Sequence, residues 1–166
     1  MNQSLLNTID HALGAFDTHG LCDINNTKLM DRVDSKFVVP AEQLPYLLQE
    51  SRRYYSLLSI DGIKHSDYLN VYFDTDDFNY YHMHHNGKLN RFKVRHRHYV
   101  DTGTAFLELK FKSNKGRTVK TRRAADLDAN KALIEHAGFL SDQGIVEPAK
   151  LQPRQTVGYQ RICLAS

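Results

Sequence analysis

Positively charged side chains alternate along residues 91–99. Arg91, Lys93, Arg95 and Arg97 occupy every second position of this stretch. Because successive side chains of a β-strand point to opposite faces, these four cations would leave one side of a strand together. Like charges in a row repel each other, so such a face must meet solvent or a polyanion. Arginine binds phosphate oxygens through paired hydrogen bonds and lysine adds a mobile charge, so the pattern favours phosphate binding.

The same alternation recurs in the two segments that follow. Residues 106–112 carry Lys110 and Lys112, and residues 117–122 carry Lys120 and Arg122. One cationic strand alone is equally consistent with a solvated sheet face. Repetition over three consecutive strand candidates favours a polyanion site.

Two acidic residues stand among these cations. Glu108 shares the predicted face of Lys110, and Asp34 stands two residues before Lys36. Each acid could hold a divalent metal ion that bridges to phosphate oxygens. Each could equally be an ion-pair partner that keeps neighbouring cations apart, and the spacing leaves both roles open.

Histidines are concentrated near the first cationic strand, at His82, His84, His85, His96 and His98. A His-x-His pair on a strand can bind a transition metal. However, His96 and His98 fall on the face opposite Arg95, and no clear third ligand accompanies them. Surface or packing roles are therefore the favoured interpretation.

The bulk composition is that of an ordinary folded domain. The chain has 166 residues, of which 41% are apolar and 25% charged, with a formal net charge of +3. Twelve of its 22 Lys and Arg fall within residues 88–123, so the field there attracts phosphates or nucleic acid. We see no signal peptide and no membrane-length apolar run, and expect a cytoplasmic protein with unpaired Cys22 and Cys163.

Periodicity and turn signals predict an α+β fold in which an antiparallel sheet positions the cations. Helices are expected over residues 4–16, 40–50 and 128–137, with a short turn or helix at 76–81. Strands are expected over residues 30–39, 55–60, 65–74, 91–99, 106–112, 117–122 and 156–164. If this curved sheet closes into a barrel, its cationic face becomes the lining of a tunnel, with helices flanking it.

Several segments contain strand motifs in the same order as a known protein family. Arg32-Val33-Asp34-Ser35-Lys36-Phe37 resembles Arg-x-Glu-x-Lys-Tyr, a strand motif of the vacuolar transporter chaperone (VTC) domain family. Asn70-Val71-Tyr72-Phe73-Asp74-Thr75 resembles its Tyr-Phe-Asp-Thr strand. Residues 91–99 are similar to its Arg-x-Lys-x-Arg-x-Arg-x-Tyr strand, and Tyr159-Gln160-Arg161 to a later Tyr-x-Arg strand. The resemblance spans about Asp31 to Arg161.

The resemblance implies a triphosphate-tunnel fold related to the CYTH phosphatases. It implies a tunnel domain over residues 29–166, preceded by an N-terminal helix and loop over residues 1–28. VTC family members include polyphosphate polymerases, which transfer the γ-phosphoryl group of ATP to a growing chain. They use a divalent metal, so manganese or magnesium is the expected cofactor, and ATP, polyphosphate or triphosphate the expected ligands.

The charge pattern and the resemblance together give a set of candidate site residues. The phosphate-binding candidates are Lys36, Arg91, Lys93, Arg95, Arg97, Lys110, Lys120, Arg122, Tyr159 and Arg161. Among them, Lys36, Arg95, Arg97 and Lys110 are the catalytic candidates. Glu108 and Asp34 are the metal-ligand candidates.

The sequence also departs from the family pattern. Asp34 stands where the family often has Glu, and Phe37 where it has Tyr. A Glu-Arg-x-Thr-x-Asp segment and a later Lys, which usually follow the Tyr-x-Arg strand, are not found before Ser166. We therefore expect a tunnel that lacks its last strands, or one that a second copy or another partner completes.

Three other functions compete with the polymerase. One is a CYTH-like triphosphatase, and another is a non-catalytic module that binds polyphosphate or triphosphate. Nucleic-acid binding is the least favoured, because single strands usually stack on exposed aromatic rings. Phe92 and Phe111 face away from the cations, although Phe106 shares their face.

Overall fold

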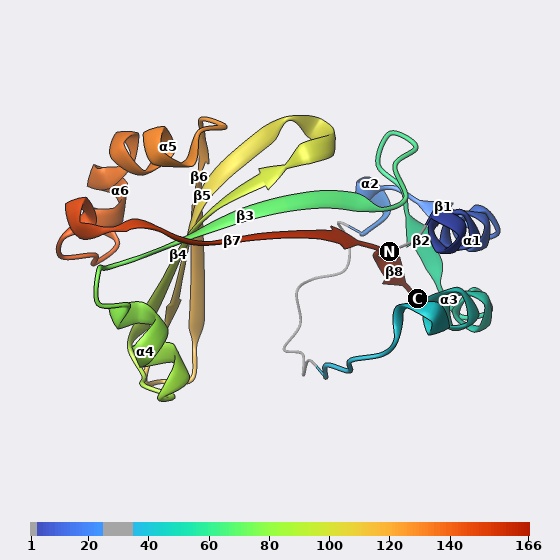
Figure 1. Ribbon diagram of the computed structural model, residues 1–166, viewed down its shortest axis with the longest axis horizontal. Coiled ribbons are helices and arrows are strands. Elements are labelled where there is room, and N and C mark those ends of the chain that lie inside the picture. The colour runs from blue at the N-terminus through green and yellow to red at the C-terminus, as the bar shows by residue number, and fades with distance from the viewer. Residues whose placement is uncertain (1–2, 25–34) are drawn as a thin grey trace. The chain divides into compact units, whose positions relative to one another are not determined.

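The computed structural model describes residues 3–24 and 35–166 (Figure 1). Within it the chain forms two compact units. The first comprises residues 1–65 with 161–166, and the second comprises residues 66–160. Each unit has its own sheet and its own apolar core.

The first unit contains a three-stranded sheet of short strands. Strand β2 (Ser56–Leu58) lies between β1 (Thr18–His19), to which it is parallel, and β8 (Leu164–Ala165), to which it is antiparallel. The helices of this unit are α1 (Gln3–Gly14), α2 (Leu21–Ile24), the 3-10 turn η1 (Ala41–Gln43) and α3 (Leu44–Ser51).

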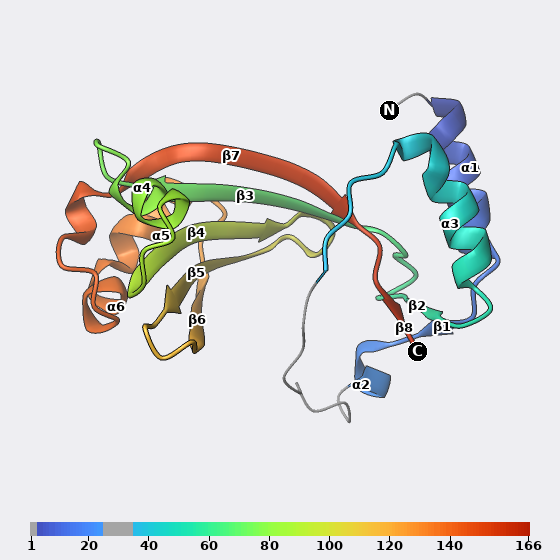
Figure 2. The ribbon, with the colours of Figure 1, turned by 90° about the horizontal axis from the view of Figure 1, so that it is seen from below.

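The core of the first unit lies between its two longer helices and β2. Ile9 and Leu13 of α1 pack with Phe16, with Leu48 of α3 and with Leu57 of β2. Helical spacing puts Ile9 and Leu13 on one face of α1, which buries them together. Figure 2 shows α1 and α3 side by side.

The second unit is built on a five-stranded sheet with the order β6-β5-β4-β3-β7. Its strands are β3 (Ser66–Asp74), β4 (Arg91–Tyr99), β5 (Thr104–Lys112), β6 (Thr118–Ala125) and β7 (Gln152–Arg161). Strands β3 to β6 are successive and antiparallel. Helix α4 (Asn79–His85) connects β3 to β4, and the turn η2 (Val100–Thr102) connects β4 to β5.

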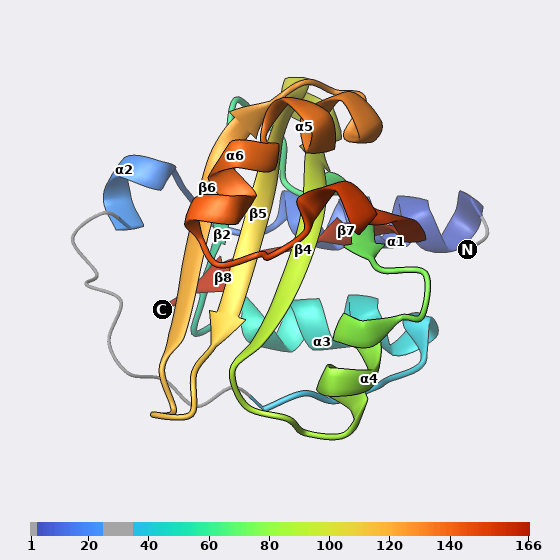
Figure 3. The same ribbon diagram turned by 90° about the vertical axis from the view of Figure 1, so that its left-hand side faces the viewer.

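One face of this sheet is apolar and covered by helices. Phe73, Val94, Leu107 and Leu109 point to this face and pack against Leu133, Leu140, Ile145 and Leu151. These partners come from α5 (Ala129–Glu135), α6 (Ala137–Asp142) and the segment that leads through η3 (Pro148–Lys150). Figure 3 shows α5 and α6 lying across β4, β5 and β6.

His96 belongs to the helix-covered face. Its side chain is 2% exposed, and its Nε2 lies 2.8 Å from the carbonyl oxygen of Asp126. A buried imidazole needs such a partner, and the contact ties β4 to the segment before α5. His96 therefore has the packing role that the sequence favoured.

Most of the predicted elements are confirmed, and three differ. The expected helix over residues 128–137 is two helices, because the backbone leaves helical geometry at His136 (φ −105°). The expected last strand begins earlier, at Gln152, and ends at Arg161. Of the expected strand over residues 30–39, the described part is not a strand, and Phe37 is 86% exposed instead of packed.

The α+β class and the antiparallel sheet are confirmed. Neither sheet closes into a barrel within the described residues, since β6 and β7 are the two ends of the five-stranded order. The described part of the chain therefore shows an open sheet with two edges.

Candidate phosphate-binding face

The register of β4, β5 and β6 brings the predicted cations together. Lys93 lies opposite Lys110, which lies opposite Lys120. Directly opposite residues of an antiparallel pair point to the same face of the sheet. We call this surface of the second unit the cationic face; its charged members are Arg91, Lys93, Arg95, Arg97, Glu108, Lys110, Lys112, Lys120 and Arg122.

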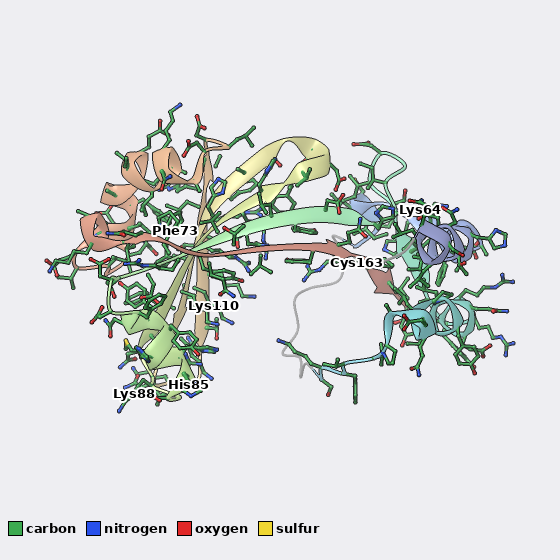
Figure 4. All side chains as sticks on the ribbon, in the orientation of Figure 1. Lys64, Phe73, His85, Lys88, Lys110 and Cys163 are labelled. Carbon is green, nitrogen blue, oxygen red and sulfur yellow. The ribbon has the colours of Figure 1, made fainter. Side chains whose placement is uncertain are left out.

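Alternation fixes which way these side chains point. Val94 and Leu109 are buried under the helices, so their neighbours Lys93 and Lys110 must leave the opposite side of the sheet. Figure 4 marks Phe73 and Lys110, which belong to the helix-covered face and to the cationic face respectively. Burial of the apolar side chains on one face thus places the charged side chains on the other face.

Arg95 is paired across the strands with Glu108. Its Nε donates a hydrogen bond of 2.7 Å to Glu108 Oε2, and its Nη2 lies 2.6 Å from the same oxygen. Its Nη1 donates to the Tyr72 hydroxyl at 3.4 Å. Burial alone would lower the pKa of Arg95, but the Tyr72 hydroxyl and the Glu108 carboxylate outweigh it and raise that pKa.

Arg97 is more deeply buried than Arg95. Its Nε donates to Asn70 Oδ1 at 3.0 Å, and its Nη2 donates to the Tyr159 hydroxyl at 3.4 Å. The guanidinium also lies 5.3 Å from the ring centroid of Tyr68. With a side chain only 11% exposed, Arg97 joins β4 to both β3 and β7. It is a structural residue of the cationic face as well as a phosphate-binding candidate.

Lys110 lies in an uncompensated positive environment. Although its side chain is exposed, partial desolvation lowers its pKa, and repulsion from Lys120 and further cations lowers it more. Within the described residues, the ion pairs of this face join Glu108 to Arg95 and Arg97 and do not include Lys110. A bound polyanion would relieve this repulsion. Mutual repulsion among neighbouring cations is typical of an anion-binding site.

Arg122 of β6 adds an aromatic contact. The guanidinium of Arg122 lies 4.5 Å from the ring centroid of Phe106. This ring is therefore covered by a cation, which reduces the surface that a nucleic-acid base could stack on.

The described residues do not fit a metal site built by the protein alone. Glu108, one expected ligand, is engaged by the guanidinium of Arg95. Asp34, the other expected ligand, lies outside the described residues. Among residues 3–24 and 35–166 no group of three His, Cys, Asp or Glu side chains is arranged to hold a metal ion.

Two other predicted residues belong to the first unit. Lys36 lies in an exposed segment without regular secondary structure, and Arg161 is the exposed last residue of β7. The cationic face is therefore described without them. Tyr159 does lie in the second unit, where its ring stacks on Tyr68 with centroids 5.1 Å apart.

Sequence reasoning missed Asn70, one of the residues that fix Arg97. Asn70 is fully buried, accepts from Arg97, and donates through Nδ2 to the carbonyl oxygen of Val157 at 3.4 Å. Asn70 could have been found from the alternation of Tyr68, Asn70 and Tyr72 along β3. This alternation places their polar groups on the cationic face.

These features define an α+β domain whose sheet has one helix-covered apolar face and one cationic face. Residues 31–164 match the family model of the VTC domain, and the chain belongs to that family. A search of curated proteins found no match. Within the described residues, no helix is long and apolar enough to cross a membrane.

Proposed function

We propose that the cationic face binds the phosphate chain of ATP or of inorganic polyphosphate. The observation that carries this proposal is the register that aligns Lys93, Lys110 and Lys120 across three strands. Lysine and arginine side chains gathered on neighbouring strands attract the repeated negative charges of a phosphate chain. Membership of the VTC domain family supports the same ligand class.

We further propose a reaction of the polyphosphate polymerase type. A terminal oxygen of the polyphosphate chain attacks the γ-phosphorus of ATP, and a new P–O bond forms. The bond from the γ-phosphorus to the β,γ-bridging oxygen breaks, and ADP leaves with that electron pair. Such a transfer depends mainly on positioning and on stabilisation of negative charge.

The side chains of the cationic face would have different roles in this reaction. Lys110 and Lys120 supply mobile charge, while Arg95 presents a guanidinium oriented by Glu108. Arg97 is nearly buried and hydrogen-bonds to Asn70 and Tyr159, so it would act as a fixed charge. A divalent ion, manganese or magnesium, would neutralise phosphate charge and would be held mainly by phosphate oxygens.

A non-catalytic binding module is the second candidate. The engagement of Glu108 by Arg95 favours it, because this carboxylate is occupied by a cation of the protein. A CYTH-like triphosphatase would use the same cationic face to hydrolyse triphosphate. The three functions differ in product and not in ligand, so turnover distinguishes them.

The test is incubation of the purified chain with ATP and manganese or magnesium, followed by electrophoresis of the products. Growing polyphosphate is the expected result. Phosphate release from tripolyphosphate without chain growth would indicate the triphosphatase, and ligand binding without turnover would indicate the binding module. Absence of both turnover and binding would contradict all three.

A further inference from the structure

A cavity lies in the second unit where β3 separates from β4. The last paired residues of these strands are Phe73 and Val94, so the beginning of β4 extends beyond β3. Helix α4 and the first half of β7 border the space that opens there. The cavity has a volume of about 830 Å³, within the range of small-molecule sites.

The lining of this cavity is mostly aromatic and apolar. Its residues include Tyr72, Phe78, Tyr81, His84, Lys93 and Val157. Residue Tyr81 is 56% exposed, and its ring stacks on that of His85 with an interplanar angle of 16°. Figure 4 shows His85 near the end of α4. Flat, partly exposed rings of this kind are suited to stack on another flat ring.

The helix that carries Tyr81 is fixed in place by side-chain capping. Both oxygens of the buried Asp74 carboxylate accept backbone hydrogen bonds, from Tyr80 N at 2.9 Å and from Tyr81 N at 2.8 Å. Thr75 Oγ1 accepts a third, from Asn79 N at 3.1 Å. The wall of the cavity is therefore ordered before any ligand binds, which reduces the entropy cost of binding.

The cavity is continuous with the cationic face. Lys93 lines the cavity and also stands in the row with Lys110 and Lys120. Burial lowers the pKa of His84, and repulsion from Lys93 lowers it further, so both effects favour the neutral imidazole. A neutral ring with one donor and one acceptor nitrogen can hydrogen-bond to the edge of a nucleobase.

We propose that this aromatic cavity binds the base of a nucleoside triphosphate whose phosphates lie on the cationic face. The inference rests on the proposed function, because it assumes that the cationic face holds the phosphates. It adds that the protein distinguishes a nucleotide from a bare phosphate chain. Lys93 stands where the two parts of the ligand meet.

The test compares ATP with methyl triphosphate, which carries the same esterified triphosphate without a base. Calorimetric titrations at one fixed magnesium concentration should show ATP binding roughly tenfold more tightly, as expected for one stacked base. Tyr81→Ala should abolish this preference and leave the affinity for methyl triphosphate unchanged. Val157→Phe, which fills the cavity and keeps the backbone carbonyl, should do the same. Tyr46→Ala, an exposed tyrosine of the first unit, should change neither affinity.

Equal affinities of the unmodified protein for the two ligands would overturn the inference. So would a Tyr81→Ala variant that binds both ligands as the unmodified protein does, or one that loses both equally while its melting temperature is unchanged. If methyl triphosphate does not bind at all, the proposed function itself fails. Titration with adenosine then decides whether the cavity binds a base without the phosphates.

Discussion

Glu108 and Arg95 lie opposite each other on β5 and β4, with Glu108 Oε2 2.7 Å from Arg95 Nε. Arg97 Nε is 3.9 Å from the same carboxylate oxygen. The carboxylate thus lies between two guanidinium groups that would otherwise repel each other. This arrangement points to a spacing role for Glu108 in a row of cations.

Glu108→Gln tests that role. Removal of one negative charge should tighten tripolyphosphate binding by roughly threefold to tenfold at low salt, and should destabilise the fold by about 1–3 kcal/mol. The measurements are titration calorimetry in EDTA and chemical denaturation. If Glu108 instead holds an essential metal ion, the variant will bind more weakly than the unmodified protein in manganese and equally well in EDTA.

Arg97→Ala should damage the fold more than it damages ligand contacts. The substitution removes hydrogen bonds to Asn70 and Tyr159 and leaves the buried Asn70 side chain without its donor. We expect a loss of about 2–4 kcal/mol in the free energy of unfolding. Arg122→Ala, at an exposed position of β6, is the matched control and should lose less than about 1 kcal/mol. Equal stability of the two variants would show that Arg97 does not join the strands.

Ligand binding should be linked to protonation of Lys110. Its pKa in the folded protein lies below the ordinary value of 10.5, so the unfolded chain binds more protons than the folded one between those two values. Stability from this group therefore rises with pH in that window. Bound phosphate restores the higher pKa, so binding should take up protons and weaken as pH rises there.

The proton uptake can be measured by calorimetry in two buffers of different ionisation enthalpy, just below pH 10.5. Lys110→Arg should abolish the part of the uptake that comes from this position, since arginine stays protonated. Unchanged proton uptake in Lys110→Arg would show that Lys110 is not part of the phosphate-binding site.

Asp74→Ala should loosen α4. The substitution removes the acceptors of the Tyr80 and Tyr81 backbone amides at the first turn of this helix. We expect a loss of about 1–3 kcal/mol in the free energy of unfolding, measured by denaturation. Asp142→Ala is the control, because Asp142 is an exposed aspartate at the end of a different helix, α6. Wild-type stability of Asp74→Ala would contradict the capping role.

The cationic face could be predicted because strand alternation is a local property. The four cations from Arg91 to Arg97 alternate with Phe92, Val94 and His96, and burial of Val94 and His96 places the cations on the opposite face. The contacts that hold Arg97 could not be predicted, because Asn70 and Tyr159 come from distant parts of the chain. The cavity depends on where β3 stops pairing with β4, which no local pattern records.

The strand expected over residues 30–39 shows the opposite case. Alternation of charged and apolar residues predicted it, and its described end is not paired. Alternation predicts which side chains would share a face if the segment formed a strand. Whether the strand forms depends on pairing with a neighbour elsewhere in the chain. Phe37 has no such neighbour within the described residues, where it is largely exposed.

The most direct test of the central claim is titration of tripolyphosphate into the unmodified protein and into the double variant Lys110→Ala/Lys120→Ala. The matched control is Lys131→Ala, which removes a lysine from α5, on the other side of the sheet. We predict binding that weakens at least tenfold in the double variant, is unchanged in the control, and falls with added salt. Absence of binding, or equal affinity in the double variant, would contradict a phosphate-binding role for the cationic face.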